Sequence, residues 1–136
     1  MSETPEDIRA SVRGRFAAIA AIPEREKKFP IGPGSAKNLG YDAEAIDRLP
    51  RSVTESFAGV GNPLRLGDIR PGETVLDLGS GAGLDCFLAA ARVGSSGKVV
   101  GVDLTEEMVE KARKNATALG VRNVEFICGP IEDLPL

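Results

Sequence analysis

The chain has 136 residues, enough for one domain with a modest hydrophobic core. A net charge of −3 without a basic stripe argues against a nucleic-acid partner, and no apolar run approaches the roughly 20 residues that cross a bilayer. The acidic N-terminus is unlike a signal peptide, so a cytoplasmic protein is expected. Cys86 and Cys128 lie among apolar neighbours and are interpreted as buried free thiols rather than as a disulfide or metal site.

Residues 1–70 are predicted to be an N-terminal extension of helices and loops. Residues 4–7 combine a helix cap, a first-turn proline and a capping-box acid, and apolar residues at helical spacing continue the helix to Pro23. A long irregular stretch rich in proline and glycine is expected over residues 30–40. A short helix is then predicted from 42 to 49, and a further helical turn from 53 to 57.

Residues 71–136 form a second segment, in which strands and helices alternate. The strands are predicted at 74–78, 98–102 and 124–128, and the helices at about 83–93 and 105–120. Thr105 is predicted to cap the second helix, and Met108, Ala112, Ala116 and Leu119 to form its buried face. Apolar strands between helices predict an α/β fold, with a parallel sheet covered on both faces and right-handed crossovers.

A glycine-rich turn joins the first of these strands to the first helix. Glycines at 79, 81 and 83 allow a sharp turn against which a ligand can lie, and Asp77 precedes them. Asp103 ends the next strand, at the distance where an α/β fold places a carboxylate on a ribose. A dinucleotide fingerprint would need glycine at 84 or 86, but these positions hold Leu84 and Cys86.

The pattern of acid, spacer and G-x-G-x-G resembles the first motif of methyltransferases that depend on S-adenosylmethionine (SAM). Residues 59–64, 71–87 and 101–108 resemble more narrowly the SAM domain of arsenite methyltransferases. This resemblance implies SAM as cofactor and a Rossmann-like SAM methyltransferase sheet, incomplete because it holds only strands one to three. By the same resemblance, the SAM loop is lined by Asp77, Gly79, Ser80, Gly81 and Gly83. Asp103 is expected to bind the ribose, with Leu104 beside it. The adenine is expected to be bordered by Ile131 and Glu132, and the methionine end to be covered by Tyr41.

Each of these acids also has a structural interpretation. Asp77 could cap the turn, Asp103 could serve the entry of the following helix, and Glu132 could be a solvated loop charge. Asp85 is interpreted as a first-turn helix acid, and Met108 as a core residue rather than an adenine contact. The chain has no histidine and no nucleophile visibly paired with a base, so no catalytic residue is assigned.

The chain departs from the arsenite methyltransferases at the thiolates that hold soft arsenic. Val60 stands where that family has a cysteine, and Cys86 and Cys128 do not match its other cysteine positions. The predicted function is therefore transfer of a methyl group from SAM to an unidentified small-molecule acceptor, with no metal. The alternative is a SAM-binding module or enzyme fragment without activity of its own.

A complete SAM methyltransferase sheet has seven strands, and the first lies in its middle. Here the sequence ends at Leu136, where the fourth strand would begin. Strand one is therefore expected to have an open apolar edge, which is an association hazard. A homodimer, or a further C-terminal segment pairing at strand one, is expected to cover it.

Overall fold

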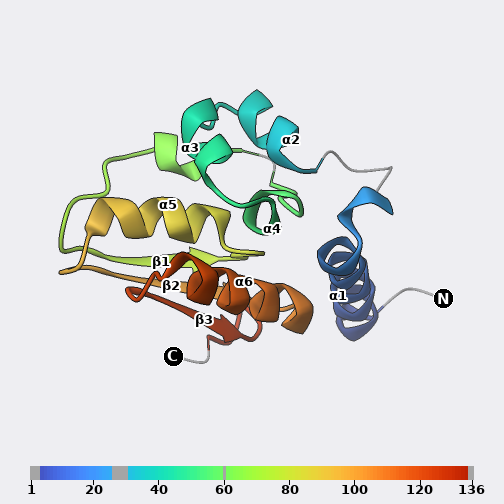
Figure 1. Ribbon diagram of the computed structural model, residues 1–136. Helices are drawn as coiled ribbons and strands as arrows, with labels where there is room; N and C mark the ends of the chain where they lie inside the picture. Colours follow the sequence, from blue (N-terminus) through green and yellow to red (C-terminus); the bar gives the residue numbers. More distant parts are fainter. Residues whose placement is uncertain (1–3, 26–30, 60, 135–136) are drawn as a thin grey trace.

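The computed structural model describes residues 4–25, 31–59 and 61–134. Its second half is a parallel sheet of three strands in the order β1-β2-β3 (Figure 1). The strands are β1 (Thr74–Leu78), β2 (Lys98–Asp103) and β3 (Val124–Cys128), and the helices between them are α5 (Leu84–Val93) and α6 (Glu106–Leu119). The predicted alternation of strands and helices is confirmed, and so is the parallel sheet.

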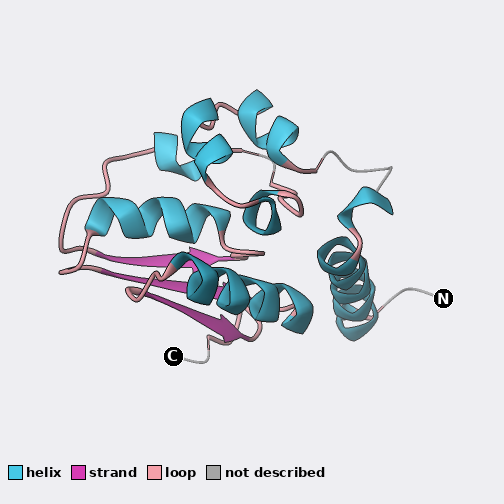
Figure 2. Ribbon diagram, in the orientation of Figure 1, coloured by secondary structure: helices cyan, strands magenta, loops and turns pink. Residues whose placement is uncertain are grey.

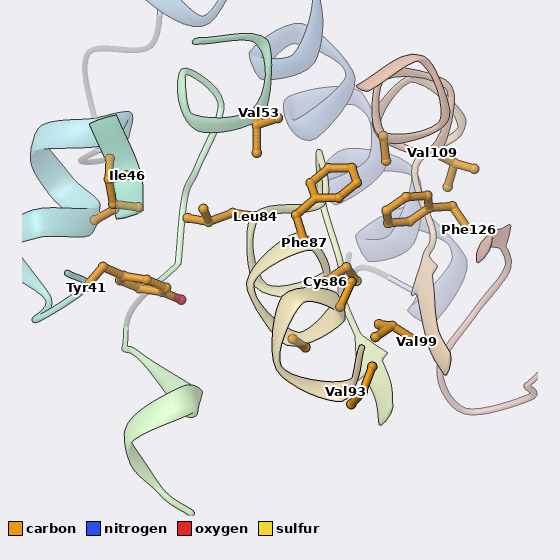
Figure 3. Packing of buried hydrophobic residues seen from close by; sticks show 14 residues of the cluster. Tyr41, Ile46, Val53, Leu84, Cys86, Phe87, Val93, Val99, Val109 and Phe126 are labelled. Carbon is orange, nitrogen blue, oxygen red and sulfur yellow. The ribbon is translucent and has the colours of Figure 1, made fainter. Parts of the chain in front are cut away.

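The hydrophobic core lies between the sheet and its two helices (Figure 3). Phe87 of α5 and Phe126 of β3 meet edge to face, with ring centroids 5.7 Å apart. Val99 of β2 and Val109 of α6 are buried in the same cluster. Both helices therefore pack on the face of the sheet that carries Phe126, as right-handed crossovers in one direction require.

The opposite face of β1 is open in the described part of the chain. Side chains alternate along a strand, so Leu76 and Leu78 point away from α5, and they are 43% and 48% exposed. The prediction that both faces of the sheet are covered is wrong for this strand, because α5 and α6 pack on the same side. The apolar run predicted the position of β1 correctly, but none of its residues is buried in the described structure.

The first half is helical and includes a helix that the sequence did not predict (Figure 2). Its elements are α1 (Pro5–Ala21), α2 (Pro33–Asn38), α3 (Ala43–Arg48) and α4 (Arg51–Thr54), with 3-10 turns at Pro23–Arg25 and Pro63–Arg65. The irregular stretch expected over residues 30–40 is wrong for α2, in which proline occupies the first turn, where its missing N–H costs nothing. The capping box at the start of α1 is confirmed.

The two halves of the chain pack against each other through shared hydrophobic clusters. Tyr41, Ile46 and Val53 from the extension belong to the same buried cluster as Leu84 and Phe87. Helix α1 packs against α6 and lies beyond the carboxyl ends of the strands in Figure 1. The division into segments 1–70 and 71–136 stays a prediction from sequence, whereas the packing places the extension next to the glycine-rich turn.

Candidate functional site

The turn after β1 is folded back onto β2 and leaves open space beside it. The backbone N–H groups of Gly79 and Ser80 donate to the carbonyl of Val102 at 2.7 and 3.0 Å. Gly79 and Gly81 have φ angles of +80° and +55°, in the region that favours glycine. A Cβ at either position would meet no protein atom within 4 Å, so the backbone of the loop is accessible to a ligand.

Asp103 ties this loop to the start of α6. Its Oδ2 accepts a hydrogen bond from the N–H of Gly81, and its Oδ1 accepts one from the N–H of Thr105, both at 2.9 Å. Thr105 is the N-cap residue of α6, but its side chain makes no capping hydrogen bond, so the predicted cap is present only in position. Asp103 accepts from the N–H of Thr105 itself, just before the helix, and not from the first-turn N–H groups that a capping side chain satisfies.

Two further acids lie below and beside the loop. The Sγ of Cys86 donates to Oδ2 of Asp77 at 3.3 Å, and the hydroxyl of Tyr41 donates to Oδ1 of Asp85. Burial, followed by the nearby charge of Asp85, raises the pKa of Asp77 to about 6. Burial also raises the pKa of Asp85, against the effect of the Tyr41 hydrogen bond. The two carboxyls thus share an environment in which a cation would be favoured.

Tyr41 is held in place by the extension. It is buried and packs edge-on against Phe57, with ring centroids 5.3 Å apart. Asp85 does stand in the first turn of α5, as predicted, but it is also part of the site. Sequence reasoning missed the pairing of Tyr41 with Asp85, because the two residues are 44 positions apart and neither has a local pattern that indicates the other.

A cavity of about 420 Å³ lies over the loop, and we call it the glycine-loop cavity. Seven of the nine predicted cofactor residues line it: Gly79, Ser80, Gly81, Asp103, Leu104, Ile131 and Glu132. Asp77 and Gly83 are not among the lining residues, and Asp77 instead contacts Cys86 behind the loop. The lining also includes Asp85 and Met108. Met108 is 2% exposed, so it serves the core and the cavity wall at once.

Helix α1 and the segment after α4 supply the remaining wall, which the sequence did not predict. Arg9, Val12 and Phe16 line the cavity from α1. Arg9 forms an ion pair with Glu132, which joins α1 to the loop after β3. The helical spacing of α1 indicated an apolar face, but not the surface that this face would meet.

Neither cysteine lines the glycine-loop cavity. Both cysteines are free; Cys86 is fully buried, and Cys128 is half-buried with its Sγ 3.6 Å from the carbonyl of Leu104. Burial is the largest cause that raises the pKa of each thiol. Val60 lies outside the described residues. Within the described ranges, no group of three or more potential ligands is placed to hold a metal ion, and no helix is long and apolar enough to cross a membrane.

Comparison with known proteins identifies the sheet-bearing half. A family described as "Methyltransferase domain" matches residues 69–136, half of the chain. The chain belongs to this methyltransferase family. The resemblance stated from its motifs is therefore confirmed.

Individual relatives agree with this assignment. An arsenite methyltransferase of Halobacterium salinarum is 42% identical, over 97% of this chain and 37% of its own length. A SAM-dependent methyltransferase structure from Aquifex aeolicus is 30% identical with a TM-score of 0.52, over 79% of this chain and 52% of that one. An arsenic(III) SAM methyltransferase structure from Chlamydomonas reinhardtii is 34% identical with a TM-score of 0.50, over 76% of this chain and 33% of that one.

These matches confirm the Rossmann-like methyltransferase fold. The methyltransferase chain spans between a third and a half of the length of the first curated relatives. Their activities belong to longer proteins, so they are carried to this chain only as a proposal.

Proposed function

We propose that this chain is the cofactor-binding part of a SAM-dependent methyltransferase that acts on a small-molecule acceptor. The observation that carries the proposal is the glycine-loop cavity. Two glycines with positive φ border open space, and Asp103 and Asp85 also line this cavity. SAM is a nucleoside joined to a cationic sulfonium and an α-ammonium group, and these match a site with hydroxyl-binding and cation-favouring carboxylates.

Each residue receives a role from its position. Asp103 would accept hydrogen bonds from the ribose hydroxyls while it holds the loop through Gly81. Leu104 and Ile131 would bracket the adenine, with Glu132 at its edge. Gly79, Ser80 and Gly81 would carry the chain under the ligand, and Asp77 and Gly83 would support this loop from behind.

Methyl transfer from SAM would depend mainly on the orientation of the methyl group toward the acceptor. SAM supplies an already activated methyl group, so the residues of this chain need to hold the cofactor and exclude water rather than move a proton. The named relatives are methyltransferases, which favours an enzyme over a SAM-binding module without activity. The acceptor stays unassigned.

The thiols and the open strand β1 support two further parts of the proposal, the location of the protein and its association. Two free cysteines support a cytoplasmic location, where thiols stay reduced. The exposed Leu76 and Leu78 support pairing at β1, with a second copy of the chain or with a further C-terminal segment.

The test is binding of S-adenosylhomocysteine (SAH), measured by calorimetry. Asp103→Ala should weaken binding by about ten- to a hundredfold, the effect of roughly 1.5 to 3 kcal/mol from hydrogen bonds to a charged group. Asp103→Asn keeps one acceptor oxygen and should fall between. Replacement of the exposed Asp68 by alanine is the control. Binding of NAD in preference to SAH, or unchanged SAH binding by Asp103→Ala, would contradict the proposal.

A further inference from the structure

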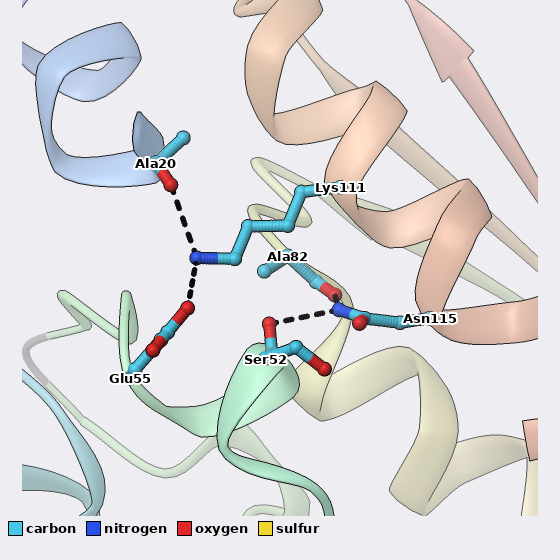
Figure 4. A network of polar contacts seen from close by, with 6 residues as sticks. All are labelled: Ala20, Ser52, Glu55, Ala82, Lys111 and Asn115. Carbon is cyan, nitrogen blue, oxygen red and sulfur yellow. Dashed lines mark hydrogen bonds and ion pairs between the residues drawn. The ribbon is translucent and has the colours of Figure 1, made fainter. Parts of the chain in front are cut away.

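Helix α6 carries two polar side chains on the face that meets the extension. Lys111 and Asn115 are one turn apart, so they share a face of the helix, and both reach across to other elements (Figure 4). We call this pair the α6 clip. Neither residue belongs to the apolar pattern that predicted the buried face of this helix.

Lys111 joins the end of α1 to the end of α4. Its Nζ donates to the carbonyl of Ala20 at 3.1 Å and to Oε1 of Glu55 at 2.7 Å. Ala20 lies in the last turn of α1, where carbonyls lack partners within the helix and a positive charge is favourable. Helix α1 has no basic residue of its own in that turn. The side chain of Lys111 is only 15% exposed, and its ammonium group takes that position from another helix.

Asn115 joins α4 to the glycine-rich loop. It is 3% exposed, and its amide donates to the carbonyl of Ser52 at 2.9 Å and to the carbonyl of Ala82 at 3.1 Å. Ala82 belongs to the loop that lines the cavity, and Ser52 lies in α4. The side chain thus fixes the loop and the extension to the same point of α6.

The elements held by the clip form one wall of the glycine-loop cavity. Arg9, Val12 and Phe16 line it from α1, and Val53 and Ser56 line it from α4 and the residues that follow. The hydroxyl of Ser56 is buried without a hydrogen-bond partner among the described residues. Because buried hydroxyls are normally paired, a polar group of a ligand in this cavity would complete the site.

Helix α1 is buried only at its C-terminal end, and its N-terminal half is joined to the loop after β3 by the partly exposed ion pair of Arg9 with Glu132. Its buried residues are Ile19 and Ala20, next to Lys111, whereas Ile8 and Val12 are 49% and 43% exposed. Arg9 lies 11 residues before Ala20, about 16 Å along the helix axis. A small tilt at the buried end of α1 therefore moves the cavity wall near Arg9 by a much larger distance.

We propose that Lys111 and Asn115 are positioning residues, which hold α1, α4 and the glycine-rich loop as a wall against the adenosine end of the cofactor. The proposal rests on the proposed function for the identity of the ligand, but not for the clip itself. The clip acts through other residues, because neither Lys111 nor Asn115 lines the cavity.

The experiment compares Lys111→Met with Lys111→Arg, which keeps the charge and the donors. Lys114→Met is the matched control, because Lys114 lies on the same helix and is exposed. SAH binding is measured by calorimetry well below the unfolding temperature, where a purely structural loss of stability does not change affinity. Hydrogen exchange of the α1 amides is measured without ligand. Asn115→Ala is measured in the same way.

We expect Lys111→Met to exchange the α1 amides faster and to bind SAH about tenfold more weakly, because binding must then restore the order of the wall that Lys111 holds in the parent protein. Lys111→Arg should restore both, and Lys114→Met should change neither. Asn115→Ala should also weaken binding. Unchanged SAH affinity in both Lys111→Met and Asn115→Ala would overturn the proposal, as would unchanged protection of α1 in Lys111→Met. If the unmodified chain bound no SAH, the proposed function would fail. Hydrogen exchange of the α1 amides would still test whether Lys111 holds α1 in place.

Discussion

Asp77 offers a test of the site through stability alone. Its carboxyl is held behind the glycine-rich loop, where it accepts a hydrogen bond from Cys86. Burial and the neighbouring Asp85 raise its pKa from the ordinary 3.8 to about 6. The folded protein thus holds the proton of Asp77 more tightly than the unfolded chain does.

The sign and size of the effect follow from this difference. Between pH 4 and 6 the folded state binds more protons than the unfolded state, so stability falls as the pH rises through this window. Above it, ionised Asp77 costs the fold about 3 kcal/mol, since each pKa unit corresponds to about 1.36 kcal/mol. Asp77→Asn removes the charge and keeps an acceptor for Cys86, so it should stabilise the ligand-free protein by about 2 to 3 kcal/mol at pH 7.5.

Urea unfolding at pH values between 4 and 8 measures this directly. The gain from Asp77→Asn should be largest at pH 7.5 and should shrink toward pH 4. Asp68→Asn, at an exposed position, is the control and should leave the pH dependence unchanged. A variant with the same pH dependence as the parent protein, or one less stable at pH 7.5, would refute the reasoning about burial.

Two other predictions concern the acceptor and the sheet. The chain of residues 1–136 should not convert arsenite to methylated products, because burial raises the pKa of both of its thiols and neither lines the cavity; chromatography showing methylarsenite well above a SAM-free control would contradict this. The chain should also self-associate through β1, whose outer edge and exposed Leu76 and Leu78 lack a partner in the described structure. Light scattering should show a mass above that of the monomer, and Leu78→Lys should reduce it. A monomer with strong hydrogen-exchange protection across β1 would show that the strand is covered in another way.

Local patterns were sufficient for the sheet and its loop. Proline, glycine and apolar runs placed β1, β2 and β3 to within a residue, because strand and helix periodicity are properties of neighbouring positions. The spacing of Gly79, Gly81 and Asp103 predicted a ligand-binding loop and a carboxylate near it. The structure joins the two by a hydrogen bond from the N–H of Gly81 to Asp103, which was not predicted. Parallel strands bring their carboxyl ends together, so residues at these ends could be expected to meet.

Tertiary structure alone decided what faces this loop. The pairing of Tyr41 with Asp85 and of Arg9 with Glu132 joins residues more than 40 positions apart, and no local period encodes such a contact. Asn115 was not predicted to be buried, because its amide is polar. The side chain can be buried only because the carbonyls of Ser52 and Ala82 accept hydrogen bonds from the amide. The sequence by itself determined the methyltransferase half and the residues of its glycine-rich loop. The second wall of the cavity was determined only by the packing of the extension onto α6, because that wall depends on which surfaces meet and not on the order of neighbouring residues.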